Sequence, residues 1–188
     1  SIQWANDRGE PDSWIEYWSG ENSKSFYFMG KDNIPFHTII WPAILTGYGN
    51  LNLPYDVPAN EYLQLEGLKI STSREWAVWL PEYLDKYDPD PLRYVLTAIM
   101  PETSDSDFTW AQYKRLNNDE LVATFGNLVH RTLSMLNRNF NSKIPERPNQ
   151  LDRESIQLLE FANGQLKNVA SNIELCKFKL ALNSAMKI

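Results

Sequence analysis

The chain has very little cysteine, since Cys176 is the only one among its 188 residues. A single thiol excludes an internal disulfide framework and a Cys-x-x-Cys zinc site. A reducing compartment is the default for such a composition, so we expect a cytoplasmic protein. No apolar run approaches membrane-spanning length and no charged-then-apolar leader is visible, so we expect no membrane partner.

Several catalytic patterns are also missing. There is neither a P-loop nor a Gly-x-Gly-x-x-Gly sequence. Only His37 and His130 are available, and no Ser/His/Asp arrangement is legible around them. The net charge of −6 argues against general nucleic-acid affinity, although a local basic patch can still bind RNA. We predict no metal site, because the clustered carboxylates fit helix caps and turns better: Asp85, Asp88, Asp90, Asp105 and Asp107.

What is present is an ordinary globular composition, with 43% hydrophobic and 22% charged residues. The length suffices for one large domain or two smaller ones. The chain begins at Ser1 in what reads as a polar connection. We therefore expect a piece of a longer protein.

The first third predicts a strand, a turn and a helix. Residues 25–29 (Ser-Phe-Tyr-Phe-Met) are typical of a buried strand, and residues 30–33 of a tight turn. Pro42 lies within the helix that follows and should kink it. Strand, turn and helix make half of a βαβ unit, and open α/β sheets bind ligands at such turns. The helix is indicated by apolar and aromatic side chains at helical spacing: His37, Ile40, Trp41, Ile44 and Leu45.

The middle third predicts a second strand, at residues 61–65, which returns through Glu66-Gly67. A polar loop at residues 69–74 follows, and then a helix over residues 76–87. Asp88-Pro89 indicates the start of another helix, which ends before Pro101.

The last third is predicted to be entirely helical. Thr109 and Gln112 form a capping box that opens a long helix reaching Phe140, and Pro145 and Pro148 interrupt the chain after it. Two more helices are expected over residues 152–162 and 168–187, the second with a capping box at Ser171 and Glu174. The pattern thus predicts a mixed α/β front half and a helical-bundle back half, divided near residue 108.

The polar loop has a composition suited to a polyanion. Lys69, Ser71, Thr72 and Ser73 offer one ammonium and three hydroxyls, which can follow phosphate oxygens as charge develops on them. The alternative is a plain solvated turn, because Lys-x-Ser-x-Ser sequences are common on protein surfaces.

The turn and helix of the first third offer a second candidate site. Asp32 follows a strand and can accept hydrogen bonds from ribose hydroxyls, or Asp32 or Asn33 can simply cap the next helix. His37, Ile40 and Trp41 share one helix face. They can line an apolar pocket with one polar handle, or they can form a core stripe with a satisfied histidine.

The long helix carries the third candidate. Asn127 and Arg131 are four residues apart, so an amide and a guanidinium project from one face and can read base edges of an unstacked RNA loop. The alternative is a solvated helix face. The most basic neighbourhood of this acidic chain surrounds the pair and suits contact with a nucleic-acid backbone: Arg131, Arg138, Lys143 and Arg147.

These segments together resemble the methionyl-tRNA synthetase family of class I aminoacyl-tRNA synthetases. The resemblance runs from about Asp12 to about Arg147 and is more diffuse beyond. Residues 66–73 (Glu-Gly-Leu-Lys-Ile-Ser-Thr-Ser) stand where that family has its Lys-Met-Ser-Lys-Ser signature. The other matching segments are Phe28-Met29-Gly30-Lys31-Asp32-Asn33-Ile34-Pro35-Phe36-His37-Thr38, Trp41-Pro42-Ala43, Asp88-Pro89-Asp90, Leu92-Arg93-Tyr94, Ser106-Asp107-Phe108 and Gly126-Asn127-Leu128 with Arg131.

The resemblance implies an α/β plus all-α fold in a C-terminal-half fragment of the family's chain. Residues 1–60 would be the rear part of a Rossmann-type nucleotide-binding domain. Residues 61–108 would be a connecting domain that carries the Lys-Ile-Ser-Thr-Ser signature loop. Residues 109–188 would form a truncated helical-bundle domain that binds the anticodon.

The resemblance also implies residue roles. Gly30 and Asp32 would contact the adenosine ribose of ATP, whose phosphates would be closed over by a catalytic loop. The pocket for the methionine side chain would be bordered by His37, Ile40 and Trp41. Asn127 and Arg131 would read bases of the CAU anticodon. The loop residues are Lys69, Ser71, Thr72 and Ser73, with Lys69 and Thr72 also counted as ATP-binding.

The implied activity is ATP-dependent ligation of methionine to its tRNA through methionyl-adenylate. ATP with Mg²⁺ is the expected substrate, and initiator and elongator methionine tRNAs are the expected partners. Thr72 departs from the family, because the second lysine of the signature belongs there. The family's His-x-x-His motif and metal-binding insertion are expected upstream of Ser1, so we expect no zinc in this segment and no activity of the segment alone. The alternative is a non-catalytic tRNA-binding or scaffold module derived from a synthetase.

Overall fold

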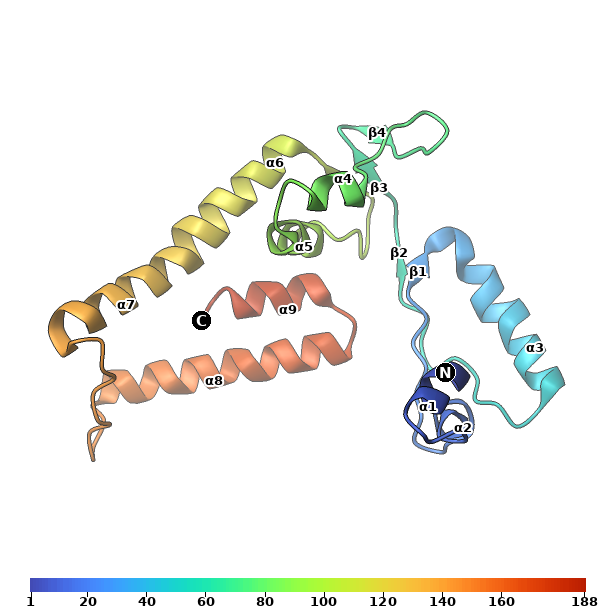
Figure 1. Cartoon of the computed structure of the whole chain (residues 1–188), viewed down its shortest axis with the longest axis horizontal. Coiled ribbons are helices and arrows are strands. Elements are labelled where there is room, and N and C mark those ends of the chain that lie inside the picture. The colour runs from blue at the N-terminus through green and yellow to red at the C-terminus, as the bar shows by residue number, and fades with distance from the viewer. The chain divides into compact units, whose positions relative to one another are not determined.

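The computed structural model describes all 188 residues, which form two compact units, Ser1–Tyr62 and Leu63–Ile188. Helices predominate in both units and the strands are short (Figure 1). None of the helices combines the length and the apolar composition that crossing a membrane would require. The three-domain division into residues 1–60, 61–108 and 109–188 stays a prediction.

The first unit contains a small βαβ arrangement. Strand β1 (Met29–Gly30) pairs in parallel with β2 (Ala59–Asn60), and the helix α3 (Trp41–Tyr48) lies in the connection between them. The predicted order of strand, turn and helix is therefore confirmed, and β2 completes the unit. The remaining elements are α1 (Ile2–Asp7), α2 (Trp14–Ser19), the 3₁₀-helix η1 (Lys31–Asn33) and the π-helix η2 (Phe36–Ile40).

The predicted buried strand at residues 25–29 is wrong in length and burial. The segment is extended but irregular, with one isolated bridge from Phe26 to Asp56 before β1 begins. Its side chains alternate, so that Tyr27 is half-buried whereas Phe26 and Phe28 are exposed. Only one face of the segment is covered by the rest of this unit, and a strand with one covered face alternates in this way.

Pro42 is accommodated by a change of helix type. Residues Phe36–Ile40 form a π-helical turn, and α3 starts at Trp41 with Pro42 in its first turn. Proline has no N–H to donate to the preceding turn, and its ring would collide with a carbonyl there. The wider π-helical turn therefore stands where a regular α-helix would have lost a hydrogen bond.

The second unit begins with a three-stranded sheet in the order β4–β3–β5. Strand β3 (Leu63–Leu65) is antiparallel to β4 (Leu68–Lys69) and parallel to β5 (Ser106–Phe108). Glu66 and Gly67 join β3 to β4 with φ of 51° and 74°, the left-handed values that a tight two-residue hairpin requires. The predicted Glu66-Gly67 return is confirmed.

The core of the second unit lies between this sheet and the helices α4 (Leu80–Leu84) and α5 (Pro89–Ala98). Asp88 stands at the cap position of α5 as predicted, although its side chain makes no cap hydrogen bond. The buried cluster consists of Leu65, Tyr83, Leu92, Val95, Ile99, Phe108 and Leu116.

The helix predicted over residues 76–87 is wrong in its first part. It begins only at Leu80, after Trp79 in an extended conformation, and Pro81 lies in its first turn. A proline in the first turn prevents the helix from extending backward, because the turn before it would lose a hydrogen bond. Trp76 instead pairs with Ser71.

A long helical segment follows from Trp110 to Phe140. Its predicted start is confirmed, because the Thr109 side chain accepts a hydrogen bond from the Gln112 N–H at 3.0 Å. The segment consists of α6 (Trp110–Arg115), the π-helix η3 (Leu116–Gly126) and α7 (Asn127–Phe140).

The two C-terminal helices differ from the prediction. The helix α8 (Arg153–Glu174) runs through Gly164, and α9 (Phe178–Ala185) follows. Gly164 costs only about 1 kcal/mol inside a long helix, too little to break it. The capping box predicted at Ser171 is wrong, since Ser171 lies inside α8. The helix ends instead at Glu174, and Cys176, just after the cap residue Leu175, adopts a left-handed φ of 55°.

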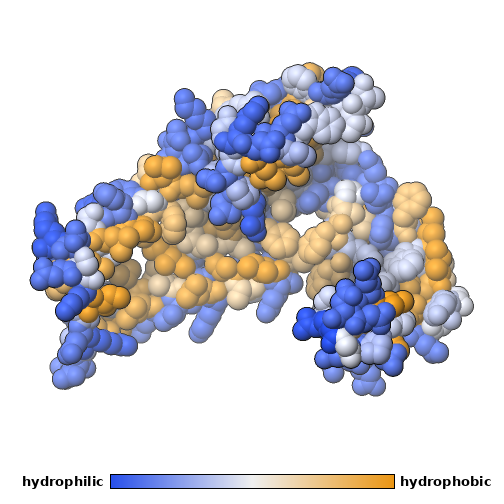
Figure 2. Space-filling model, viewed as in Figure 1, coloured by the Kyte–Doolittle hydropathy of each residue, from blue (hydrophilic) through white to orange (hydrophobic).

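The C-terminal helices expose much of their apolar surface. Neither α7 nor α8 has a buried residue, and α8 packs chiefly against α9. Figure 2 shows hydrophobic side chains along both helices. Those that are at least half exposed include Leu128, Leu133, Met135, Leu158, Leu166 and Ile173.

Candidate functional site

Asp32 lies directly after β1, in the 3₁₀-helix η1. Its Oδ1 accepts a hydrogen bond from the Tyr62 hydroxyl at 2.5 Å. Lys31 forms an ion pair with Glu61, and its ammonium lies 4.1 Å from the centre of the Tyr62 ring. The side chain of Asp32 therefore belongs to a polar group at the ends of the two parallel strands.

Neither Asp32 nor its neighbour Asn33 caps a helix. No side-chain cap hydrogen bond is made at the start of η1, η2 or α3. The capping interpretation of Asp32 is therefore wrong. Gly30 ends β1 and Asp32 lies in the turn that follows it, and the contact of these two residues with ribose stays a prediction.

His37 and Trp41 lie on one side of the η2–α3 helix and contact Tyr27. The Trp41 indole N–H donates to the Tyr27 hydroxyl at 2.9 Å, and the rings of Tyr27 and His37 are 5.6 Å apart. His37 Nδ1 lies 3.2 Å from the Asn33 carbonyl oxygen. His37 and Trp41 are half-buried, whereas Ile40 is 48% exposed. His37 and Trp41 thus form a half-buried aromatic patch with Tyr27, and Ile40 lies exposed beside it in the sequence, so the three residues are not a closed core stripe.

Sequence reasoning missed Tyr27 and Tyr62 as members of this region. Tyr27 was detectable in principle, because it occupies the covered face of an alternating segment together with Ser25 and Met29. Tyr62 contacts Asp32 only because β1 and β2 are parallel neighbours, and a pairing across 30 residues has no local signal.

The loop after β4 is closed by backbone hydrogen bonds. Ser71 and Trp76 exchange N–H to carbonyl bonds of 2.9 Å in both directions, and the Glu75 N–H donates to the Thr72 carbonyl at 3.1 Å. The hydroxyls of Ser71 and Ser73 are 3.1 Å apart. We call residues 63–76 the Lys69 hairpin.

The polar side chains of the Lys69 hairpin lie on the surface. Lys69, Thr72 and Ser73 are exposed and Ser71 is partly covered. The Arg74 guanidinium donates to the Lys69 carbonyl at 3.2 Å, which brings a second cation to the start of the loop. The structure thus brings together Lys69, Ser71, Thr72 and Ser73 on one short loop.

The base of the Lys69 hairpin is bound to the start of the long helix. The Gly67 N–H donates to both carboxylate oxygens of Asp107 at 2.9 and 3.0 Å. The Glu66 carboxylate accepts from the Trp110 N–H at 2.8 Å, and the Trp76 indole donates to the Leu65 carbonyl at 2.9 Å. Sequence reasoning did not foresee these contacts, two of which join residues 40 and 44 positions apart.

Asn127 and Arg131 both lie on α7, where they are exposed. Neither side chain has a hydrogen-bond or ion-pair partner in the chain. The helix α7 that carries them is the far part of the long helical segment, away from β4 (Figure 1). Two unpaired polar side chains one helical turn apart remain available to an external partner.

Two tyrosines, Tyr83 (buried) and Tyr94 (partly buried), tie the helices near this segment together. Burial raises the pKa of Tyr83 and Tyr94, so both hydroxyls stay protonated. Tyr94 donates to Glu120 in η3, and the Tyr83 hydroxyl lies 2.7 Å from that of Tyr113. No group of three or more His, Cys, Asp or Glu side chains is arranged to hold a metal ion.

Comparison with known proteins defines the class. The family model described as "tRNA synthetases class I (M)" matches residues 1–133. The chain belongs to this family.

The curated relatives that it matches are about three times as long. The chain is 49% identical to the methionine–tRNA ligase of Roseiflexus castenholzii, over 100% of the chain and 32% of that protein. It is 52% identical to the methionine–tRNA ligase of Dehalococcoides mccartyi, over 100% of the chain and 34% of that protein. The chain therefore spans about a third of the length of these relatives.

Solved structures show the same fold. Methionyl-tRNA synthetase of Mycobacterium tuberculosis in complex with methionyl-adenylate has a TM-score of 0.80 and 27% sequence identity, covering 98% of this chain and 36% of that one. The same enzyme in its apo form gives a TM-score of 0.77 and 26% identity, over 98% of this chain and 35% of that one.

Proposed function

We propose that the full-length protein is an ATP-dependent ligase that attaches methionine to its tRNA through methionyl-adenylate. The observation that carries this proposal is identity near 50% to methionine–tRNA ligases over the whole chain. The polar Lys69 hairpin supports it, because its composition suits phosphate contact. The 188-residue chain is proposed to be inactive alone, since it spans about a third of those relatives.

The first step needs positioning and charge neutralisation more than proton transfer. A carboxylate oxygen of methionine attacks the α-phosphorus of ATP, a new P–O bond forms, and the bond to the leaving pyrophosphate breaks. Lys69 is proposed to neutralise charge on the phosphates, while the hydroxyls of Ser71, Thr72 and Ser73 donate hydrogen bonds to phosphate oxygens. This chemistry requires no acid–base pair in the chain.

The remaining site residues are proposed to bind the substrates. Gly30 and Asp32 would hold the ribose of ATP, and His37, Ile40 and Trp41 would border the methionine side chain. The half-buried aromatic patch around Tyr27 supports this assignment, because apolar pockets with few polar groups suit a thioether side chain. ATP is proposed to enter with Mg²⁺.

The tRNA partners are proposed to be initiator and elongator methionine tRNAs, read at the anticodon. Asn127 and Arg131 carry this assignment. Both are exposed and unpaired on one face of α7, where an amide and a guanidinium can bind base edges. A protein with this role works beside the ribosome, so we propose a cytoplasmic location without a membrane partner.

The test is Lys69→Ala in the full-length protein, with Lys167→Ala on the exposed surface of α8 as the matched control. Methionine-dependent pyrophosphate exchange should fall roughly 100-fold in Lys69→Ala, the scale of losing one transition-state donor. Methionine affinity should stay nearly unchanged, because Lys69 is not assigned to the methionine pocket. An unchanged exchange rate in Lys69→Ala contradicts the catalytic role.

Thr72 favours a second candidate, a non-catalytic tRNA-binding or scaffold module. A hydroxyl stands where the family signature has a second ammonium, so the loop carries less positive charge. This candidate predicts that the wild-type full-length protein binds methionine tRNA but exchanges no pyrophosphate. Measurable exchange by the wild type rules it out.

A further inference from the structure

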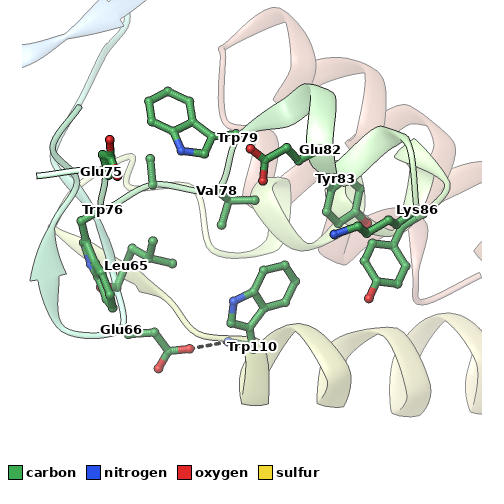
Figure 3. A pocket seen from close by; sticks show the side chains of 12 residues that line it. Leu65, Glu66, Glu75, Trp76, Val78, Trp79, Glu82, Tyr83, Lys86 and Trp110 are labelled. Atoms are coloured by element: carbon green, nitrogen blue, oxygen red, sulfur yellow. Dashed lines mark hydrogen bonds between the residues drawn. The ribbon is translucent and has the colours of Figure 1, made fainter. Parts of the chain in front are cut away.

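A pocket of about 510 Å³ lies on the second unit and is lined in part by the Lys69 hairpin (Figure 3). Residues from the hairpin, from α4 and from the start of α6 surround it. None of the residues assigned to ATP, methionine or the anticodon lines this pocket. The pocket is therefore distinct from the assigned sites, and the chemistry of its ligand is inferred from its own side chains.

Aromatic rings form much of the pocket's wall. Trp76, Trp79, Trp110, Tyr83 and Tyr87 all line it. Trp79 and Trp110 are 41% and 43% exposed, so a bound molecule can reach their rings. The Trp76 indole N–H is already bound to the Leu65 carbonyl, which fixes that ring at the wall. Rings held in this way offer electron-rich faces to methylene groups and to cations.

Three carboxylates stand at separate points around these rings. Glu66 comes from the hairpin turn, Glu75 from the end of the loop and Glu82 from α4 (Figure 3). The Glu75 and Glu82 side chains have no hydrogen-bond or ion-pair partner in the chain. Lys86 is the only cationic side chain of the lining. The pocket thus carries net negative charge beside aromatic surface.

Glu75 is held in an unusual backbone conformation. Its φ is 53°, in the left-handed region that disfavours residues with a side chain. The hydrogen bonds from the Glu75 N–H to Thr72 and between Ser71 and Trp76 hold it there. Strained positions of this kind often occur where a side chain has a functional task. Here the result is an exposed carboxylate, without a partner in the chain, at the edge of the pocket.

From this arrangement we propose that the pocket binds a linear aliphatic polyamine. Such a molecule carries several ammonium groups joined by short methylene chains. The ammonium groups can pair with carboxylates that stand apart. The methylene chains can pack on the aromatic rings of the lining. A polyanion is excluded by the charge of the pocket, and a bare divalent cation would leave the aromatic surface unused.

The pocket adjoins the loop that carries Lys69. Trp76 forms one side of the backbone pair that closes this loop, and Glu75 is hydrogen-bonded to its Thr72. A ligand on Glu75 and Trp76 would therefore stabilise the loop in this hydrogen-bonded conformation. Binding itself does not depend on the function proposed above, and it is measured without any enzymatic readout.

The experiment is calorimetric titration of the full-length protein with spermidine at fixed ionic strength. Saturable binding is expected. Glu82→Gln and Trp79→Leu should each raise Kd about fivefold, the scale of one exposed charge or cation–π contact. Glu160→Gln, an equal change of charge on the exposed surface of α8, should leave Kd within about twofold.

A variant that is expected to bind more tightly distinguishes a true change of affinity from loss of binding through misfolding. Lys86→Met removes the cation that repels the ligand, so it should lower Kd. Excess Mg²⁺ at the same ionic strength should not displace spermidine, because it cannot use the rings. The proposal is overturned by absence of saturable binding, by equal effects of Glu82→Gln and Glu160→Gln, or by a higher Kd in Lys86→Met. Full displacement by Mg²⁺ would show a simple cation site and overturn it as well.

Discussion

The second unit contains two regions that are built differently. Residues 63–116 enclose a buried cluster, and the Lys69 hairpin is fixed to it by backbone and side-chain hydrogen bonds. Helices α7 and α8 contain no buried residue, and their apolar side chains lie largely exposed. In the first region shape is imposed by tertiary packing, whereas in the second it is imposed mainly by the helix itself.

This difference fits the two tasks proposed for them. A loop that contacts phosphates must hold several donors at fixed positions, and positioning of that quality needs a packed support. A helix that reads unstacked bases needs side chains that are free to reach them. Asn127 and Arg131 are unpaired and exposed. The backbone of the Lys69 hairpin, by contrast, is hydrogen-bonded between Ser71 and Trp76 and from Gly67 to Asp107.

The largest effect that tests this contrast is on stability. Phe108 is 3% exposed and lies in the buried cluster, so Phe108→Ala should lower the free energy of unfolding by about 3–5 kcal/mol. Leu133 on α7 is 59% exposed, so Leu133→Ala should change it by no more than about 0.5 kcal/mol. Urea unfolding followed by tryptophan fluorescence measures both, and similar losses would break the contrast.

A smaller effect tests the exposed helix. Arg131→Ala in the full-length protein should weaken binding of methionine tRNA by about 1–3 kcal/mol, the scale of losing one side chain that reads a base. Arg138→Ala removes the same charge from the same helix and should weaken binding less. Filter binding at constant salt measures both affinities. Equal losses would mean that α7 contributes charge and reads no base.

The smallest effect concerns the start of α8. The Ser155 N–H donates to the Asp152 carboxylate at 2.6 Å and lowers the pKa of that carboxyl below its ordinary value of 3.8. A carboxyl with a lowered folded pKa stabilises the helix fully above the unfolded value, and this contribution is lost as the pH falls through the folded pKa. Helical content followed by circular dichroism should therefore decline slightly below about pH 4.

Asp152→Asn is the control for this effect. Asparagine caps helices about as well as aspartate but does not titrate. The variant should keep the helix at neutral pH and lose this part of the decline in acid. An identical acid profile for both proteins would show that Asp152 does not contribute.

The sequence was informative where signals are local. Three features were predictable, because each depends on residues a few positions apart. They are the Glu66-Gly67 return, the Thr109 cap, and the order of strand, turn and helix that leads from β1 to α3. Cys176 shows the limit of such signals. It lies just beyond the end of α8, at a position where glycine or asparagine is usual, so the sequence pointed instead to Gly164.

The sequence was uninformative where contacts are distant. Two hydrogen bonds depend on which strands become neighbours: Gly67 to Asp107, and Tyr62 to Asp32. No spacing in the sequence reveals which strands pair. Trp76 is a further case. The sequence placed it at the start of a predicted helix over residues 76–87, but its indole and backbone bind the hairpin. The polar residues of the candidate site could be predicted, because they share one loop or one helix face. The residues that hold them in place could not be predicted.

In the helical segment from Trp110 to Phe140, a small change of angle at one end produces a large displacement of the other end. At about 1.5 Å per residue the segment is roughly 45 Å long, and its near end is fixed by Thr109 and by Glu66. A tilt of about 5° at that end would shift the far end by roughly 4 Å, about the spacing of consecutive Cα atoms. The reach of Arg131 is thus governed by an angle set some six helical turns away.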